Sequence, residues 1–187
     1  TTANKIIALA DGTAGNGSAS ALTATDTAAI GLAGVDTPAE LALFNEIIDG
    51  SQIGTVDTHA ELAAIARVVQ AIMLTAAGGT PNPALTVADY ALIGITGLDS
   101  SSLSFMAAQI AATADNGTGV DSLTELQTLA TSSAAQAATA AALTLISAYD
   151  GTNQAPVLST YSTAGVTGVT SSNLTLVNSY VAALTPA

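Results

Sequence analysis

The sequence predicts an all-α fold built of tandem three-helix repeats, each with a short, a medium and a long helix, in an elongated array. Three observations predict it. A Gly-x-x-Gly pair recurs at three places, which begin at Gly31, Gly94 and Gly165. Apolar residues follow each pair with the i, i+3, i+7 spacing of one face of an amphipathic helix. Helix-capping residues stand at matching places before these stretches. The period is about 65–70 residues, which is typical of a helical repeat array.

This period sets the expected domain boundaries. Residues 1–12 are the end of a preceding repeat, 13–79 form repeat 1, 80–151 form repeat 2, and 152–187 are the first half of a further repeat. A core of about 65 residues made of Leu, Ile and Ala is only marginally stable alone. We therefore expect neighbouring copies to cover each other's apolar ends.

The short helix is predicted at 23–30, 86–93 and 159–164. Thr23 with Asp26, and Thr86 with Asp89, stand at the spacing of a capping box, in which a Thr hydroxyl and an acidic side chain satisfy each other's backbone N–H groups. The Gly that follows each stretch supplies the left-handed residue that commonly ends a helix.

The medium helix is predicted to begin at Thr37, Ser100 or Ser171. Thr37 is followed by Pro at the first helical position and by Glu40, a strong start signal. One apolar face then recurs in all three copies: Leu41, Phe44 and Ile48; Leu103, Met106 and Ile110; Leu174, Val177 and Val181.

The long helix is predicted to begin at Thr58 or Ser122, each with Glu three residues later. In the first copy its apolar stripe is Leu62, Ile65, Val69 and Ile72. In the second copy the helix is about eight residues longer, close to two turns, so its buried face keeps its phase.

The motif that carries the repeat reads P-A-L-T-V-A-D-Y-A-L-I-G-I-T-G-L over residues 83–98 and G-V-D-S-L-T-E-L over 119–126. It resembles the Ala/Thr-rich helical tandem repeats of giant bacterial surface adhesins. This resemblance implies an extracellular spacer at the bacterial cell surface, and it supplies no catalytic residue. The third copy departs from the motif, because Thr160 stands where the others have Asp.

The composition excludes several function classes. With 2 Lys and Arg against 14 Asp and Glu, and a net charge of −12, the chain lacks the basic surface that nucleic-acid binding needs. There is no Cys, so disulfides, thiolate metal sites and thiol nucleophiles are excluded. We expect no signal peptide and no membrane insertion, since no uninterrupted apolar stretch approaches about 18 residues.

The loops between the medium and long helices are the candidate cation sites. They hold Asp49 and Asp57 in the first copy, and Asp115, Asn116 and Asp121 in the second. Carboxylates, an amide oxygen and carbonyls in a Gly-bent loop are ligands that calcium accepts. Helix capping alone explains the same residues, and no known calcium-loop spacing is matched. No other cofactor is expected.

The remaining polar residues are expected to have structural roles and no catalytic or binding role. His59 follows the cap Thr58, and Leu123 takes its place in the next copy, so we expect a solvated first-turn histidine. Tyr90 and Tyr161 occupy the same place in two copies and are expected to pack between helices. Nearly every acidic residue stands in a predicted first helical turn, where the helix dipole favours it, or in a loop, so we expect no enzyme.

Two functions remain open. The first is a structural spacer or stalk of an adhesin or extracellular fibre, whose partners are neighbouring repeats or subunits of the same protein. The second is a binding or self-assembly module, such as a surface-layer or filament subunit or a repeat that recognises a glycan or peptide.

Overall fold

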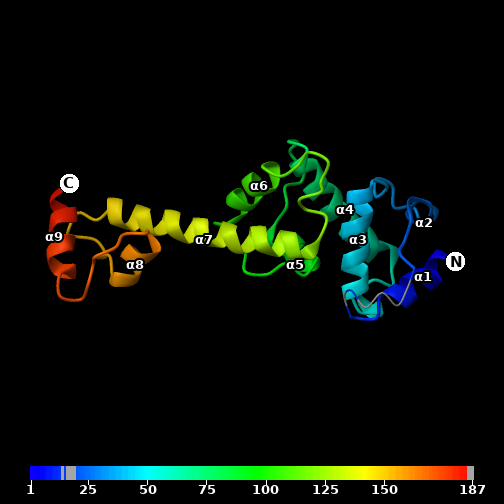
Figure 1. Cartoon of the computed structure of the whole chain (residues 1–187), viewed down its shortest axis with the longest axis horizontal. Coiled ribbons are helices and arrows are strands. Elements are labelled where there is room, and N and C mark those ends of the chain that lie inside the picture. The colour runs from blue at the N-terminus through cyan, green and yellow to red at the C-terminus, as the bar shows by residue number, and fades with distance from the viewer. Residues whose placement is uncertain (14, 16–19, 185–187) are drawn as a thin grey trace. The chain divides into compact units, whose positions relative to one another are not determined.

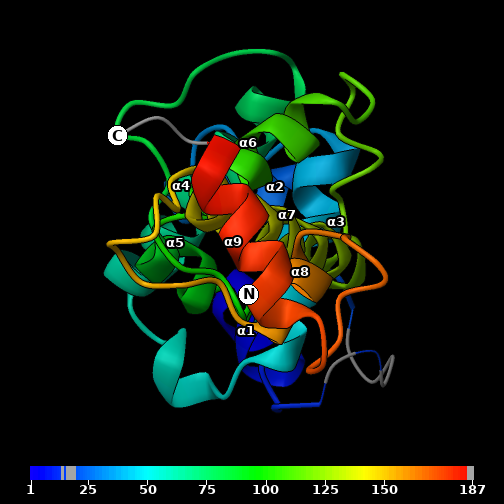
Figure 2. The same cartoon turned by 90° about the vertical axis from the view of Figure 1, so that its left-hand side faces the viewer.

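The structure is a computed structural model that describes residues 1–13, 15 and 20–184. Within these residues all regular elements are helices, apart from one isolated antiparallel bridge between Asp11 and Gln52, so the predicted all-α class is confirmed (Figure 1). Figure 2 shows the same helices from a perpendicular direction. In chain order they are α1 (Thr2–Leu9), α2 (Ala24–Ala29), α3 (Pro38–Gly50), the 3-10 helix η1 (Ile53–Thr55), α4 (His59–Ala76), α5 (Val87–Leu92), α6 (Leu103–Ala111), α7 (Leu123–Ser147), α8 (Leu158–Thr163) and α9 (Leu174–Leu184).

The chain divides into two compact units, Thr1–Ser133 and Ala134–Ala187, and the border between them falls inside α7. The predicted repeat borders lie elsewhere, after residues 79 and 151. The two divisions describe different things, since compact units reflect packing and the sequence period reflects recurring local signals. The repeat borders and the elongated array stay predictions.

Two of the three short helices begin at their predicted capping boxes, whereas α8 begins at Leu158, one residue before the predicted start at 159 and without a capping side chain. In α2 the Thr23 hydroxyl accepts the N–H of Asp26 at 3.3 Å, and the Asp26 carboxylate accepts the N–H of Thr23 at 3.0 Å. Thr86 and Asp89 form the same capping box before α5. α8 follows Val157, whose N–H donates to the Thr160 hydroxyl at 3.3 Å.

The same three helices end in one recurring motif. After α2, the N–H of Gly31 bonds to the carbonyl of Ala28 at 3.0 Å, and the N–H of Leu32 bonds to that of Thr27 at 2.9 Å. These two bonds form a Schellman motif, which needs a left-handed residue at the position of Gly31. Gly31 has a φ of +77°, and the glycines after α5 and α8 have φ values of +86° and +77°.

The medium helices begin differently in different copies. α3 begins after Thr37, as predicted, with a capping box to Glu40. α6 and α9 begin at Leu103 and Leu174, so the predicted starts at Ser100 and Ser171 are wrong. Before α6, the Asp99 carboxylate accepts the N–H groups of the two serines that follow Ser100 (Ser101 and Ser102), which holds these residues in a turn.

The long helices begin where the sequence predicts. Thr58 caps α4 through a capping box with Glu61. Ser122 precedes α7, and its hydroxyl accepts the N–H of Glu125 at 3.3 Å. α7 has 25 residues and α4 has 18, so the longer second copy is also confirmed.

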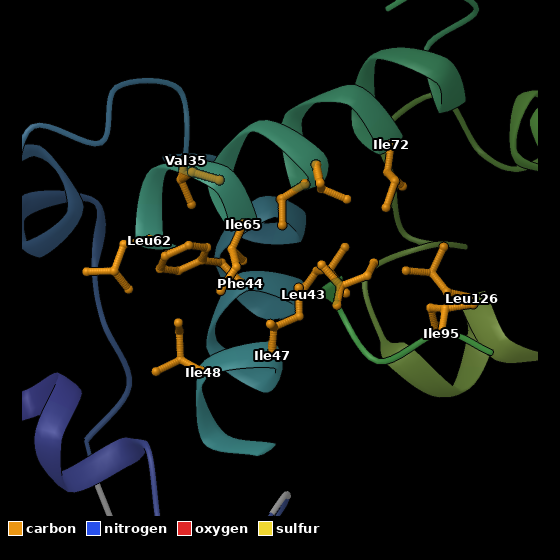
Figure 3. Close-up of a cluster of buried hydrophobic side chains, with 14 of the residues drawn as sticks. Val35, Leu43, Phe44, Ile47, Ile48, Leu62, Ile65, Ile72, Ile95 and Leu126 are labelled. Carbon is orange, nitrogen blue, oxygen red and sulfur yellow. The ribbon is translucent and has the colours of Figure 1, made fainter. Parts of the chain in front are cut away.

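Unit 1 is organised around α4. This helix packs against α3 and also against α5 and α6. Its predicted apolar stripe is buried: Leu62, Ile65, Val69 and Ile72. Figure 3 shows side chains of α3 and α4 in a cluster that also holds Ile95 and Leu126, so residues from both predicted repeats share one hydrophobic core.

Unit 2 has a smaller interior. Its buried residues among those described include Ala137, Ala142, Tyr161 and Asn178. On α9 the predicted face of Leu174, Val177 and Val181 is half-buried, whereas Phe44 and Ile48 at the matching places on α3 are fully buried.

Two helices in the described part of the chain have the length and apolar composition of a membrane span, α4 and α7. Half of α4 is buried in the unit 1 core, which explains its apolar composition as that of a core helix. Helices of this kind are weak support for a membrane location, and the absence of membrane insertion stays a prediction.

Candidate functional site

The most distinctive polar contacts join each short helix to the helix before it. Lys5 on α1 places its Nζ 2.6 Å from Oδ2 of Asp26 on α2. Arg67 on α4 forms an ion pair with Asp89 on α5 in the same way. The sequence contains two Lys and Arg residues in all, so both cations of the chain serve this one arrangement.

Both acidic partners hold the third position of a capping box, so each carboxylate joins a helix start to a neighbouring helix. The hydrogen bonds from Lys5 and then from Thr23 hold the pKa of Asp26 well below its usual value. Burial acts to raise the pKa of Asp89, but hydrogen bonds from Thr86 and the charge of Arg67 outweigh it, and the pKa lies below its usual value. Both carboxylates are therefore ionised at neutral pH and keep both contacts.

The third copy replaces this arrangement with a neutral one. Thr160 stands at the position of the two Asp residues. In the preceding helix, the Thr139 hydroxyl donates to the carbonyl of Thr163 at 3.2 Å. The acid and its basic partner are thus both absent from this copy, and a hydroxyl contact joins the long helix to the short one.

A second contact links α3 to the start of α7. The Glu46 carboxylate on α3 accepts the N–H of Leu123, the first residue of α7, at 3.0 Å. The first backbone N–H groups of a helix have no partner within it, and a carboxylate there also meets the positive end of the helix dipole. A side chain of the first predicted repeat therefore caps a helix of the second.

The first predicted calcium loop places its two carboxylates in separate surroundings. Asp49 is buried in the last turn of α3, and its carboxylate accepts the N–H of Gly15. Asp57 is exposed beside Glu61, whose pKa is lowered by hydrogen bonds from Thr58 first and Asp57 afterwards. Each acid therefore supports local backbone or a helix start.

The second predicted loop, which begins at Asp115, holds an exposed acid and two local contacts. The Asn116 side-chain oxygen accepts the N–H of Thr118 at 3.2 Å and its hydroxyl at 2.9 Å. Burial and the nearby negative charge of Glu125 raise the pKa of Asp121. Among the described residues no three His, Asp or Glu side chains lie together as a metal site requires. Calcium in either loop stays a prediction.

The single histidine and the paired tyrosines lie where the sequence predicts. His59 is exposed at the first position of α4, on the rim of an apolar hollow formed with Ile6, Ile7 and Ile30. Tyr90 and Tyr161 are both 2% exposed, which confirms that they pack between helices.

Two asparagines on the medium helices were missed by the sequence reasoning. Asn45 on α3 donates its side-chain N–H to the carbonyl of Leu22 at 2.9 Å and accepts the N–H of Leu22 at 2.6 Å. Asn178 occupies the matching position on α9, where it donates to the carbonyl of Pro156 at 3.0 Å and accepts the hydroxyl of Tyr161 at 2.6 Å. The sequence did contain a signal for them, because an Asn stands at the same position in two of the predicted medium helices.

We compared the chain with protein-family models, curated proteins and solved structures, and none of them matches it. The resemblance to surface-adhesin repeats consequently rests on the motif residues alone.

Proposed function

We propose that this chain is a stretch of tandem helical spacer from an extracellular bacterial surface protein, an adhesin or fibre in which repeats hold a functional tip away from the cell. The observation that carries the proposal is the recurrence of one connection, Lys5 to Asp26 and Arg67 to Asp89. A connection that recurs between successive helices is what a tandem array needs, because each copy is then held by its neighbours.

Shared burial supports the same proposal. α4 packs on α3 within its own predicted repeat and on α5 and α6 of the next one. Glu46 adds a polar contact across the same border. Each further copy would therefore bury apolar surface that a single copy leaves exposed, which favours a continuous rod over independent domains linked by flexible segments.

The exposed face of α9 gives a third line of support. Leu43 and Ile47 on α3 are 0% and 3% exposed. Leu176 and Tyr180 stand at the matching places on α9 and are 59% and 67% exposed. In the proposed array, a helix equivalent to α4 would cover this face.

The charge is compatible with an extracellular location. Fourteen acidic residues face two basic ones, and both basic residues are engaged in ion pairs. A surface of this kind is strongly solvated and self-repelling, which keeps a long array soluble and extended.

Small-angle X-ray scattering combined with light scattering tests the proposal on the 187-residue chain. A spacer stays monomeric across a wide range of protein concentrations, with a scattering profile of an elongated particle. Filaments or sheets that form as the concentration rises would overturn the spacer and favour the alternative, a self-assembling surface-layer or fibre subunit.

A binding module remains the second candidate because one observation favours it. At one matched position of the medium helices, Asn45 on α3 and Asn178 on α9 correspond to Ala107 on α6, which lines a pocket.

A further inference from the structure

A pocket of about 540 Å³ lies in unit 1 between the end of α4, the loop that follows it, α5 and α6. Its walls are mainly apolar. The lining includes Leu85, Tyr90, Leu103, Ser104 and Ala107. Ligand sites in proteins are commonly concave and apolar with a few placed polar groups, so the polar groups of this pocket indicate what it would accept.

The pocket occupies the place where the other two copies hold an asparagine side chain. In unit 2 the Asn178 carboxamide lies between the Tyr161 hydroxyl and the Pro156 carbonyl. The matching residues of the pocket are Ala107, Tyr90 and Leu85, and all three line it. Replacement of Asn by Ala at this step leaves the tyrosine and the carbonyl without the carboxamide that lies between them in unit 2.

The Tyr90 hydroxyl is the polar group that this replacement leaves without a partner. The side chain is 2% exposed, and within the described residues no hydrogen bond from its hydroxyl is found, whereas the equivalent Tyr161 donates to Asn178. Among the described residues no buried side-chain polar atom lacks a hydrogen-bond partner, so this hydroxyl is accessible from the pocket, where a ligand can bond to it in place of water. Burial, followed by the negative charge of Asp89, raises the pKa of Tyr90, so the hydroxyl keeps its proton and can donate.

We propose that this pocket binds a primary carboxamide carried on an apolar body, with the amide carbonyl accepting from Tyr90 and the amide N–H donating to the carbonyl of Leu85. The apolar part of the ligand lies against Leu103 and the neighbouring small residues. The ligand class covers small aliphatic amides and the Gln or Asn side chain of a peptide. This site is independent of the spacer proposal, since a spacer repeat can carry it or lack it.

The test is a titration of the isotopically labelled chain with hexanamide, followed by nuclear magnetic resonance. We expect saturable shifts at residues 78–90 and on α6. N,N-dimethylhexanamide, which cannot donate, is expected to bind about fivefold more weakly, the factor that one neutral hydrogen bond corresponds to. Hexanoate is expected to bind more weakly still, because a buried carboxylate lacks a cationic partner here. A capped Gly-Gln-Gly peptide against its Glu counterpart then tells a peptide ligand from a free amide.

Three variants make the result decisive. Ala107→Asn supplies the carboxamide from the chain itself and should abolish binding, whereas Ala108→Asn, one step along α6 and outside the pocket lining, should leave it intact. Tyr90→Phe should weaken binding about fivefold, and it decides the question if Ala107→Asn fails to fold. Equal binding of hexanamide and its dimethyl analogue, undiminished binding by a folded Ala107→Asn, or shifts confined to other parts of the chain would each overturn the site.

Discussion

Nζ of Lys5 lies 2.6 Å from Oδ2 of Asp26, and the same carboxylate accepts the backbone N–H of Thr23 at 3.0 Å. One acidic side chain thus completes a helix cap and anchors that helix to its predecessor. Arg67 and Asp89 repeat the relationship one copy later. The fold therefore uses its two basic residues to anchor the starts of the first two short helices, α2 and α5.

Loss of one of these pairs should cost little stability by itself. We expect Arg67→Met to destabilise the chain by about 0.5 kcal/mol, because the Arg67 side chain is 41% exposed and exposed ion pairs are weak. A double-mutant cycle with Asp89→Asn in urea unfolding isolates the pair. The coupling should shrink in 1 M salt. A salt-independent coupling would show that the contact acts through packing of the arginine stem.

Acid should destabilise the fold. The pKa values of Asp26, Glu61 and Asp89 lie below their usual values, so these groups bind protons less readily when folded. Their contribution to stability is complete above the unfolded pKa of about 4 and is lost as the pH falls toward the lower folded values. Thermal unfolding between pH 6 and pH 2.5 should show this loss. A midpoint that holds constant through this range would contradict the assigned contacts.

The raised pKa of Asp121 acts in the opposite direction. Burial and Glu125 disfavour its charged form in the folded chain, so its ionisation opposes folding once the pH rises through the folded pKa. Asp121→Asn should therefore raise the unfolding midpoint slightly at pH 7, and the increase should vanish in acid. A lowered midpoint at pH 7 would show that the charge stabilises the loop.

Two leucines at matching places on α3 and α9 provide a sharp comparison. Leu43→Ala should destabilise unit 1 by about 3 kcal/mol, because it leaves a cavity beside α4 at a position that is 0% exposed. Leu176→Ala should change stability by less than about 0.5 kcal/mol, since its side chain is 59% exposed. Urea unfolding of both variants measures the difference, and similar costs would show that the α9 face is covered in solution.

The glycine after α5 should resist substitution for conformational reasons alone. Gly94 has a φ of +86°, and an added Cβ would meet no atom within 4 Å. Gly94→Ala should cost about 1 kcal/mol, the penalty for a left-handed alanine. Gly54→Ala is the control, since Gly54 is equally uncrowded but is not left-handed. The stability of the Gly54→Ala variant should stay the same or rise slightly. Equal effects at both sites would contradict the Schellman account.

The predicted calcium loops have a direct test. If residues 115–121 bind calcium, millimolar calcium should raise the unfolding midpoint, because a ligand that binds the native state alone stabilises it. Magnesium is the matched control, and the calcium response should disappear in Asp115→Asn. An unmoved midpoint would leave helix capping as the role of these residues.

Local signals in the sequence predict most of the helix starts, because capping is a short-range effect. Thr23, Thr58 and Thr86 each lie three residues before the acid they bond. The late start of α6 was missed because Asp99 competes for the backbone N–H groups of two serines, and a serine run resembles a cap in sequence. The apolar stripe of α4 was predictable from its 3.6-residue period.

Contacts between residues far apart in the sequence could not be predicted from local signals. Nothing local to Lys5 indicates Asp26, and nothing local to Asn45 indicates Leu22. The pocket beside Tyr90 exists because Ala107 lacks the carboxamide that Asn45 and Asn178 have at the matching positions. This difference becomes apparent when the apolar faces of the three medium helices are aligned. The candidate cation loops were inferred from residue types, and the fold separates most of those residues into local contacts.

Small-angle scattering on one, two and three fused copies of residues 13–151 tests the spacer proposal most directly. A tandem spacer predicts that each copy adds the same increment to the maximum dimension while the particle stays a single chain. A maximum dimension that grows far less than in proportion to copy number, as for a compact globule, or an assembly whose mass rises with concentration, would contradict it.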